Sequence, residues 1–227
     1  VPQYLVTLNH TGLDNTANST VVIVNGVPKS FSDLPFSDWF DNSSWITYLY
    51  SDIVSSSISG KRFSLTIVTG PPSPIHVTRA VTVTGNYKTQ FYLTVTSPYG
   101  TPSGEDWYDE CTYAYADLDI GIVDHGNGTR RVFNYWGGDA SGTNYANSDP
   151  IHMDRPKTAI ANWKTQFLLV VRTDPDGLSP QPTRSPLGEA GPPSSWWYDD
   201  STNVILTAPL VKGYTFVDWD VDGTSQG

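Results

Sequence analysis

Residues 73–90 read SPIHVTRAVTVTGNYKTQ, and residues 149–166 repeat the pattern as DPIHMDRPKTAIANWKTQ. Both copies begin with Pro-Ile-His after one residue, both end with Lys-Thr-Gln, and an apolar run follows each of them. The chain opens on the same kind of run, QYLVTL, after its first two residues. Internal similarity of this kind is typical of repeated structural units. Three units therefore begin at Gln3, Gln90 and Gln166.

Two further sequence anchors recur in the same order. A Trp-aromatic-Asp triplet precedes a strand-like run at residues 39–41, 107–109 and 197–199. An aromatic residue stands three positions before a Trp at Phe133/Trp136 and at Phe216/Trp219. We therefore divide the chain into module 1 (residues 1–87, the most divergent), module 2 (88–163) and module 3 (164–227). Module 3 ends before the counterpart of the strand that closes the other two.

The composition favours strands over helices. Aromatic residues make up 13% of the chain, and Thr, Ser, Val, Tyr and Trp recur in short runs between 19 glycines and 17 prolines. β-branched and aromatic residues suit a pleated, half-buried surface, and Gly and Pro punctuate short strands. No stretch carries an apolar period of 3.6 residues long enough for a helix. The sequence predicts an all-β protein, a linear array of tandem small modules. Each module is either a β-sandwich or a β-grasp-like sheet without its helix.

The repeated unit resembles the divergent internalin-type B repeat of bacterial and archaeal cell-surface proteins. Residues 213–219 (GYTFVDW) are similar to the central motif of that repeat. Residues 151–154 (IHMD) and 158–163 (TAIANW) are similar to its closing strand, and the Lys-Thr-Gln links look like those of archaeal surface proteins. The resemblance implies a β-module used as a spacer, stalk, filament or coat, and it carries no catalytic residues.

The acidic charge balance excludes two classes of partner. The net charge is −10 and the pI is near 4.6, so a nucleic-acid backbone or an anionic membrane face would be repelled. No apolar run is long enough to span a bilayer. We expect neither nucleic-acid binding nor direct membrane insertion. The single cysteine, Cys111, allows no disulfide within the chain and leaves an intermolecular disulfide as the alternative.

Four sequons favour export from the cell. The pattern N-x-[ST], with x not Pro, occurs in polar, turn-like contexts at Asn9, Asn18, Asn42 and Asn127. This pattern is the acceptor for N-linked glycans in secreted proteins. We therefore expect N-linked glycans at these asparagines and an extracellular, cell-surface location.

No arrangement of residues favours catalysis. The acidic pairs at residues 105–106 and 109–110 lie at or beside the repeated triplet, and adjacent acids in a strand point apart. His76 and His152 share one repeat position beside an Ile, and the sequence supplies no further metal ligands for them. Because the prominent residues recur from unit to unit, we interpret them as architecture and expect no enzymatic activity.

One pattern indicates a cation and one residue indicates a contact. Asp218, Asp220 and Asp222 match the opening of a calcium-binding loop. The alternative is a polar β-turn, because the matching turn of module 2 lacks the first two acids. Apart from calcium there, we expect no cofactor. Trp196, an extra aromatic beside the repeated triplet, is the best candidate for an exposed contact.

The missing strand of module 3 bears on function. A module without its closing strand exposes backbone groups and part of a core. Either the protein continues past residue 227, or a strand from a neighbouring molecule completes the module. A head-to-tail contact of that kind builds open filaments. We expect an extracellular structural glycoprotein that assembles with copies of itself into a filament, sheath or surface layer. The alternative is an adhesin or carbohydrate-binding stalk, an accessory module of a larger secreted protein.

Overall fold

The structure is a computed structural model that describes residues 1–226. These residues form β-strands and one 3-10 turn (Phe31–Asp33), with no α-helix in the described range, so the all-β prediction is confirmed. From the N-terminus the strands are β1 (Gln3–Thr11), β2 (Val22–Val24), β3 (Val27–Lys29), β4 (Phe36–Asp41), β5 (Trp45–Ile46), β6 (Tyr48–Tyr50), β7 (Ile53–Ser55), β8 (Lys61–Thr69), β9 (Ile75–His76), β10 (Val81–Thr96), β11 (Pro102–Ser103) and β12 (Asp106–Asp109). They continue as β13 (Tyr113–Ala114), β14 (Asp117–Leu118), β15 (Ile122–Asp124), β16 (Thr129–Gly138), β17 (Ile151–His152), β18 (Lys157–Val170), β19 (Thr183–Ser185), β20 (Glu189–Ala190), β21 (Ser195–Asp199), β22 (Ile205–Thr207), β23 (Trp219–Val221) and β24 (Thr224–Gln226).

The chain divides into two compact units. The first unit is Val1–Asp119 with Tyr135–Ala161, and the second is Ile120–Asn134 with Asn162–Gly227. The division falls within β16 and β18, so each of these strands contributes to both units. The division into three modules, and the choice between sandwich and grasp-like sheet, stay predictions. Within residues 1–226 we find no helix with the length and hydrophobicity needed to cross a membrane.

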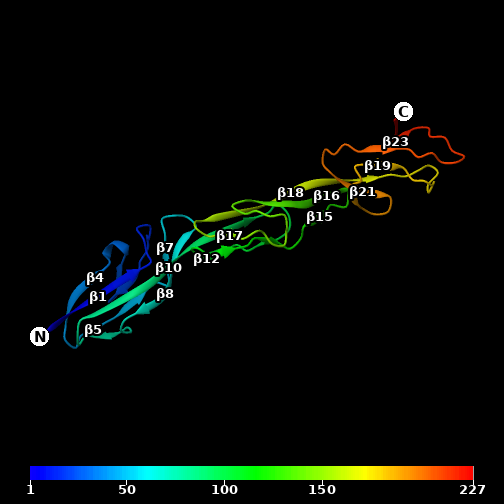
Figure 1. Cartoon of the computed structure of the whole chain (residues 1–227). Coiled ribbons are helices and arrows are strands. Elements are labelled where there is room, and N and C mark those ends of the chain that lie inside the picture. Colours follow the sequence, from blue (N-terminus) through cyan, green and yellow to red (C-terminus); the bar gives the residue numbers. More distant parts are fainter. Residues whose placement is uncertain (227) are drawn as a thin grey trace. The chain divides into compact units, whose positions relative to one another are not determined.

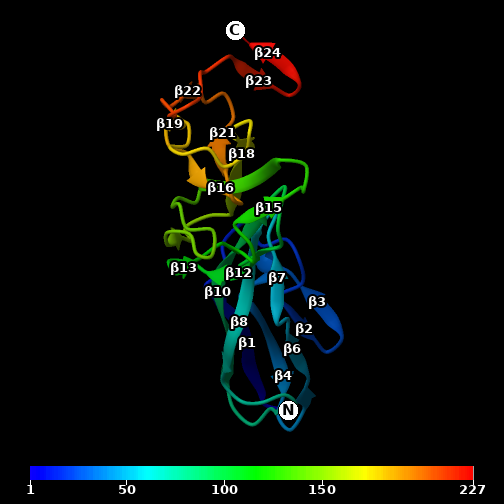
Figure 2. The same ribbon diagram turned by 90° about the vertical axis from the view of Figure 1, so that its right-hand side faces the viewer.

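The long strand β10 organises the first unit (Figure 1). Residues 81–86 pair in parallel with residues 6–11 of β1. Further along, residues 90–93 pair antiparallel with β12, and residues 93–96 pair in parallel with residues 157–160 of β18. The first part of β10 thus pairs with β1, and its last part pairs with β12 and β18. Figure 2 shows β1, β8 and β10 side by side.

One antiparallel register recurs three times along the chain. β1 pairs with β4, β10 with β12, and β18 with β21. The predicted starts lie opposite the aspartates of the predicted triplets, in the pairs Gln3↔Asp41, Gln90↔Asp109 and Gln166↔Asp199. Since a shift of one residue would exchange the two faces of a strand, this common register puts equivalent side chains in equivalent places.

The core of the first unit follows the period of two residues that a pleated strand imposes. In β10 the side chains of Val83, Tyr87, Leu93 and Val95 are buried, all on odd-numbered positions. They belong to one face, and on its N-terminal part they pack with a cluster from the surrounding strands. That cluster contains Val6, Leu8, Val21, Val22, Val24, Ile46, Tyr50, Val54, Phe63, Ile75 and Val77.

Two tyrosines place hydroxyl groups inside this core. The Tyr50 hydroxyl donates to the Asn9 carbonyl at 2.7 Å, and the Tyr87 hydroxyl donates to the Ser51 carbonyl at 2.9 Å. Burial raises the pKa of Tyr50 to about 12 and raises that of Tyr87 as well. Both groups therefore stay neutral donors, and each buried hydroxyl is satisfied by a backbone carbonyl.

We predict that Gly85→Ala destabilises the first unit. A Cβ atom at this position would lie 2.5 Å from Cδ1 of the Tyr50 ring, which is itself held by its hydroxyl. Overpacking of this kind costs about 1–3 kcal/mol. The measurement is the urea midpoint of unfolding, with Thr82→Ala, an exposed change on the same strand, as the control. Equal midpoints for the two variants would show that the Tyr50 ring moves freely.

Candidate functional site

The first strand joint is a polar cluster on the face of β10 opposite the core. It consists of Arg62, Lys88, Gln90, Trp107 and Asp109. The Gln90 amide donates to the Asp109 carboxylate at 2.8 Å, and the Arg62 guanidinium donates to the Gln90 carbonyl oxygen at 2.8 Å. Lys88 pairs with Asp109 at 2.6 Å, and the guanidinium of Arg62 lies 4.3 Å from the centre of the Trp107 ring. Together they tie β8, β10 and β12 to one another.

The second strand joint repeats this arrangement in the second unit. It consists of Arg130, Lys164, Gln166, Trp197 and Asp199. The Gln166 amide donates to Asp199 at 2.8 Å, and Arg130 donates to the Gln166 carbonyl oxygen at 2.7 Å. Lys164 pairs with Asp199 at 2.9 Å, and the Arg130 guanidinium lies 4.5 Å from the Trp197 ring centre. A charged side chain stacked on an indole in this way adds cation–π attraction to the hydrogen bonds.

The second joint has an additional acid. Glu189 of β20 pairs with Arg130 at 2.5 Å and accepts a hydrogen bond from the Gln166 amide at 2.8 Å. Gln166 is only 1% exposed, and its amide and carbonyl groups are all used. Buried polar groups that are fully bonded fix one arrangement of the strands around them.

The start of the chain contains half of such a joint. The Gln3 amide donates to Asp41 at 3.0 Å, as in the other two places. The backbone hydrogen bonds are also equivalent. The amide of the residue after the aspartate donates to the carbonyl of Pro2 here, and to the carbonyls of Thr89 and Thr165 in the two joints. Val1 therefore occupies the position of the two joint lysines, and Trp39, which corresponds to the two stacked tryptophans, is 61% exposed.

A tight turn follows the aspartate in all three places. Ser43, Cys111 and Ser201 have positive φ angles of 68°, 64° and 64°. The amide of the next residue donates to the aspartate carbonyl at 3.1 Å each time. Cys111 is exposed at this turn, which two serines form equally well. The thiol is thus not needed by the backbone, and an intermolecular disulfide stays a prediction.

The joints also lower the pKa values of their carboxyl groups. Partial burial acts to raise the pKa of Asp109, but hydrogen bonds from Lys88 and Gln90 outweigh it and bring the pKa below its usual value. The pKa of Asp199 is lowered in the same way, against partial burial, by Lys164 and Gln166. Both carboxyl groups are therefore stabilised in their charged form.

The predicted glycosylation sites differ in accessibility. Asn18, Asn42 and Asn127 are exposed, and Asn42 lies in the turn after β4. The Asn127 side chain accepts a hydrogen bond from the Thr129 amide at 3.2 Å, within the connection from β15 to β16. Asn9 is half-buried inside β1 and accepts from the His10 amide at 2.8 Å. Glycosylation at all four stays a prediction.

The proposed calcium ligands lie at a β-hairpin. Asp220 is in β23, and Asp222 with Gly223 forms the turn to β24, both with positive φ. This is the turn chemistry that a two-residue hairpin requires. Asp218 accepts a hydrogen bond from the Ser225 hydroxyl. Within residues 1–226 no group of three or more His, Cys, Asp or Glu side chains is placed to hold a metal ion, and calcium binding stays a prediction.

The remaining candidates have structural partners. The Glu105 carboxylate accepts from the Tyr92 hydroxyl at 3.0 Å and from the Val95 amide at 3.1 Å. His76 is stacked on Trp45 at 4.6 Å, and His152 lies against Tyr113 at 5.4 Å, so the repeat position holds an exposed aromatic–His pair each time. Trp196 is half-buried under the guanidinium of Arg184, 3.2 Å from its ring centre.

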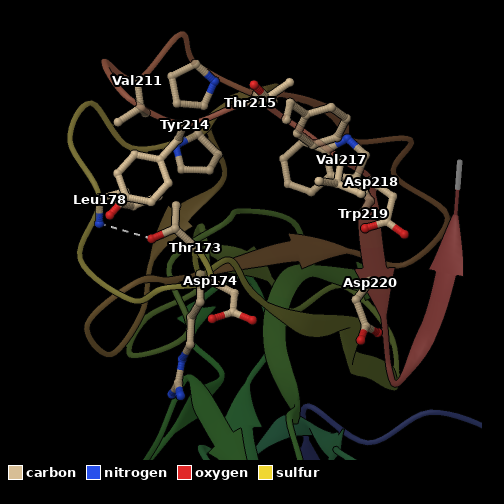
Figure 3. A pocket seen from close by; sticks show the side chains of 15 residues that line it. Thr173, Asp174, Leu178, Val211, Tyr214, Thr215, Val217, Asp218, Trp219 and Asp220 are labelled. Carbon is tan, nitrogen blue, oxygen red and sulfur yellow. Dashed lines mark hydrogen bonds between the residues drawn. The ribbon is translucent and has the colours of Figure 1, made fainter.

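Sequence reasoning missed a pocket in the second unit. It has a volume of about 430 Å³ and lies between residues 172–182 and residues 208–220 (Figure 3). Tyr214, Phe216 and Trp219 line it, and the Leu178 amide closes one wall by donating to Thr173 at 3.1 Å. The GYTFVDW motif at residues 213–219 could have indicated the pocket, because its three aromatic side chains line this space.

We predict that Gln166→Met lowers stability by about 1–3 kcal/mol, because Arg130, Asp199 and Glu189 lose a buried hydrogen-bond partner while the volume is kept. Gln3→Met is the matched control, since Gln3 has the same register but is exposed. Its effect should stay below about 0.5 kcal/mol. Urea unfolding measures both, and a larger loss for Gln3→Met would contradict the assignment.

The pH dependence of stability tests the joint carboxylates. Because their folded pKa values are lowered, the stability they contribute is complete above about pH 4 and is lost as the pH falls below it. Asp199→Asn should therefore lower the urea midpoint at pH 6 and change it much less at pH 3. Since Asp199 is half exposed, we expect an effect of about 1 kcal/mol or less. Asp200→Asn, the exposed neighbour, serves as the control, and a pH-independent effect of Asp199→Asn would argue against a charged joint.

Comparisons with family models, curated proteins and solved structures find no match for this chain. The resemblance to the internalin-type B repeat thus rests on the quoted motifs and remains a prediction.

Proposed function

We propose that the chain is an extracellular structural protein, a subunit of a surface filament, sheath or surface layer whose β-modules join head to tail. The observation that carries the proposal is the recurrence of one strand joint at Gln90 and Gln166, with half of it at Gln3. The Gln, Lys, Trp and Asp residues that recur in the sequence hold neighbouring strands together in the same way in both joints. A repeated structural role is what an array of modules needs and what a single active site does not need.

The exposed half joint supplies a contact of known geometry for a preceding module. Among residues 1–226, no arginine stacks on Trp39 and no lysine pairs with Asp41, in contrast to Trp107 and Asp109. A module end that carries an arginine in the place of Arg62 would complete the stacking on Trp39, either from the same chain or from another copy, whereas Val1 already occupies the lysine position. The stacked Arg on Trp39 would bury apolar area and add cation–π attraction. Self-association through this face is therefore the expected partner interaction.

A second candidate function has its own support. Trp39, Trp45 and Tyr113 are large, exposed aromatic side chains. Rings of this kind stack on sugars, so an adhesin or carbohydrate-binding stalk is the alternative.

Electron microscopy of the purified protein and of the cell surface tests the proposal. We expect regular fibres or sheets, and we expect Trp39→Ala to shorten or abolish them because it removes the stacking surface of the half joint. Trp45→Ala is the matched control, an exposed tryptophan of the same unit that lies outside the joint. Isolated monomers that bind a glycan array, with both variants weakening binding, would favour the adhesin instead.

A further inference from the structure

Among the described residues of the second unit, one edge of β18 is uncovered at its C-terminal end, after Leu168. The Val171 amide donates to the Ser194 carbonyl beside β21, and the Leu168 amide donates to the Gly128 carbonyl on the other side. Since successive amides of a strand point to alternate edges, the Val170 amide points away from β21. Val170 is 47% exposed, and the described residues place no strand beyond Leu168 on that edge.

The same edge is covered at both equivalent positions of the chain. The common register with Gln3, Gln90 and Gln166 makes residues 169–171 the counterparts of residues 6–8 and 93–95. Residues 6–8 are covered in parallel by residues 81–83, and residues 93–95 by residues 157–159. Two like strands therefore already perform, within this protein, the pairing that β18 lacks.

The pocket lined by residues 172–174, which follow β18, matches what such a strand carries. In the second unit Trp163 packs edge-to-face on Phe133, with ring centres 6.0 Å apart. The sequence aligns Phe133 with Phe216, which lines the pocket and is 52% exposed. Arg172 and Thr173, which follow β18 after Val171, form one wall of the pocket. The pocket thus lies where the aromatic residue of a covering strand would be expected to pack.

The charge of the pocket agrees with the same occupant. Asp174, Asp218 and Asp220 lie on its lining together with a single cation, Arg172. Residues 157–166, KTAIANWKTQ, carry two basic side chains and no acid. In β18 this segment places small residues on its buried face, since Ala159 and Ala161 are both buried.

We propose that the uncovered edge of β18 and its pocket form an acceptor site for a parallel β-strand with the sequence pattern of residues 157–166. The first residue of that pattern lies opposite Leu169, and its tryptophan enters the pocket against Phe216. Main-chain hydrogen bonds to Val170 supply affinity, and the aromatic residue supplies selectivity. This inference rests on the proposed head-to-tail assembly and names the element that one module end accepts.

The test uses the whole chain and a labelled synthetic peptide of residues 149–166. We expect saturable binding by fluorescence anisotropy and slower hydrogen exchange at the Val170 amide. Phe216→Ala in the chain, and Trp163→Ala in the peptide, should each weaken binding at least about tenfold, as loss of a buried aromatic anchor does. Ile205→Ala, an exposed apolar residue outside the pocket, is the control and should leave binding unchanged. The peptide variant keeps the test valid if Phe216→Ala fails to fold.

Three results would overturn the acceptor site. They are absence of binding, binding that is indifferent to both aromatic substitutions, and slow exchange at Val170 before any peptide is added. The outcome is separate from that of the assembly. Fibres without peptide binding would rule out the acceptor site and leave the proposed function intact. Peptide binding without fibres would support the acceptor site and argue against the proposed assembly.

Discussion

A hydrogen bond between a glutamine amide and an aspartate on the neighbouring strand is the constraint on which the rest of this structure depends. It fixes the register of β1 with β4, of β10 with β12 and of β18 with β21. Once the register is set, the alternation of side chains decides which residues are buried. The odd-numbered apolar residues of β10 then face the core, while Gln90 faces the opposite side and is bonded by Arg62. The joint and the core are two consequences of one alignment.

The amino-acid sequence predicted the all-β character and marked the residues that recur in the joints, but it predicted neither their register nor the rest of the joint. The glutamines and the Trp-aromatic-Asp triplets were found because pairing in the sheet and similarity in the sequence coincide at these positions. The arginines were not found. Arg62 lies 28 residues before its glutamine and Arg130 lies 36 residues before its own, so insertions between them hide their equivalence. Glu189 has no counterpart in the first joint and could not have been predicted by comparison.

The pocket illustrates a different limit. Phe216 aligns with Phe133, and comparison alone would bury both. Phe133 is buried and has Trp163 edge-to-face on its ring, whereas Phe216 is left half exposed. Exposure is therefore decided by a partner distant in sequence and not by the local motif. A turn depends on its own residues, so the hairpin turn at Asp222 and Gly223 was predictable from the sequence. The pocket depends on residues distant in sequence and was not predictable.

The parallel pairing of β1 with β10 has a mechanical consequence. Tension that pulls the N-terminal end of β1 against the C-terminal end of β10 acts along both strands, so the six residue pairs between them are loaded together in shear. Strands that are pulled apart from one end release their bonds one at a time, which takes far less force. Forced unfolding is governed by the rate of crossing the barrier. This geometry therefore gives the first unit resistance to stretching that its thermodynamic stability alone would not indicate.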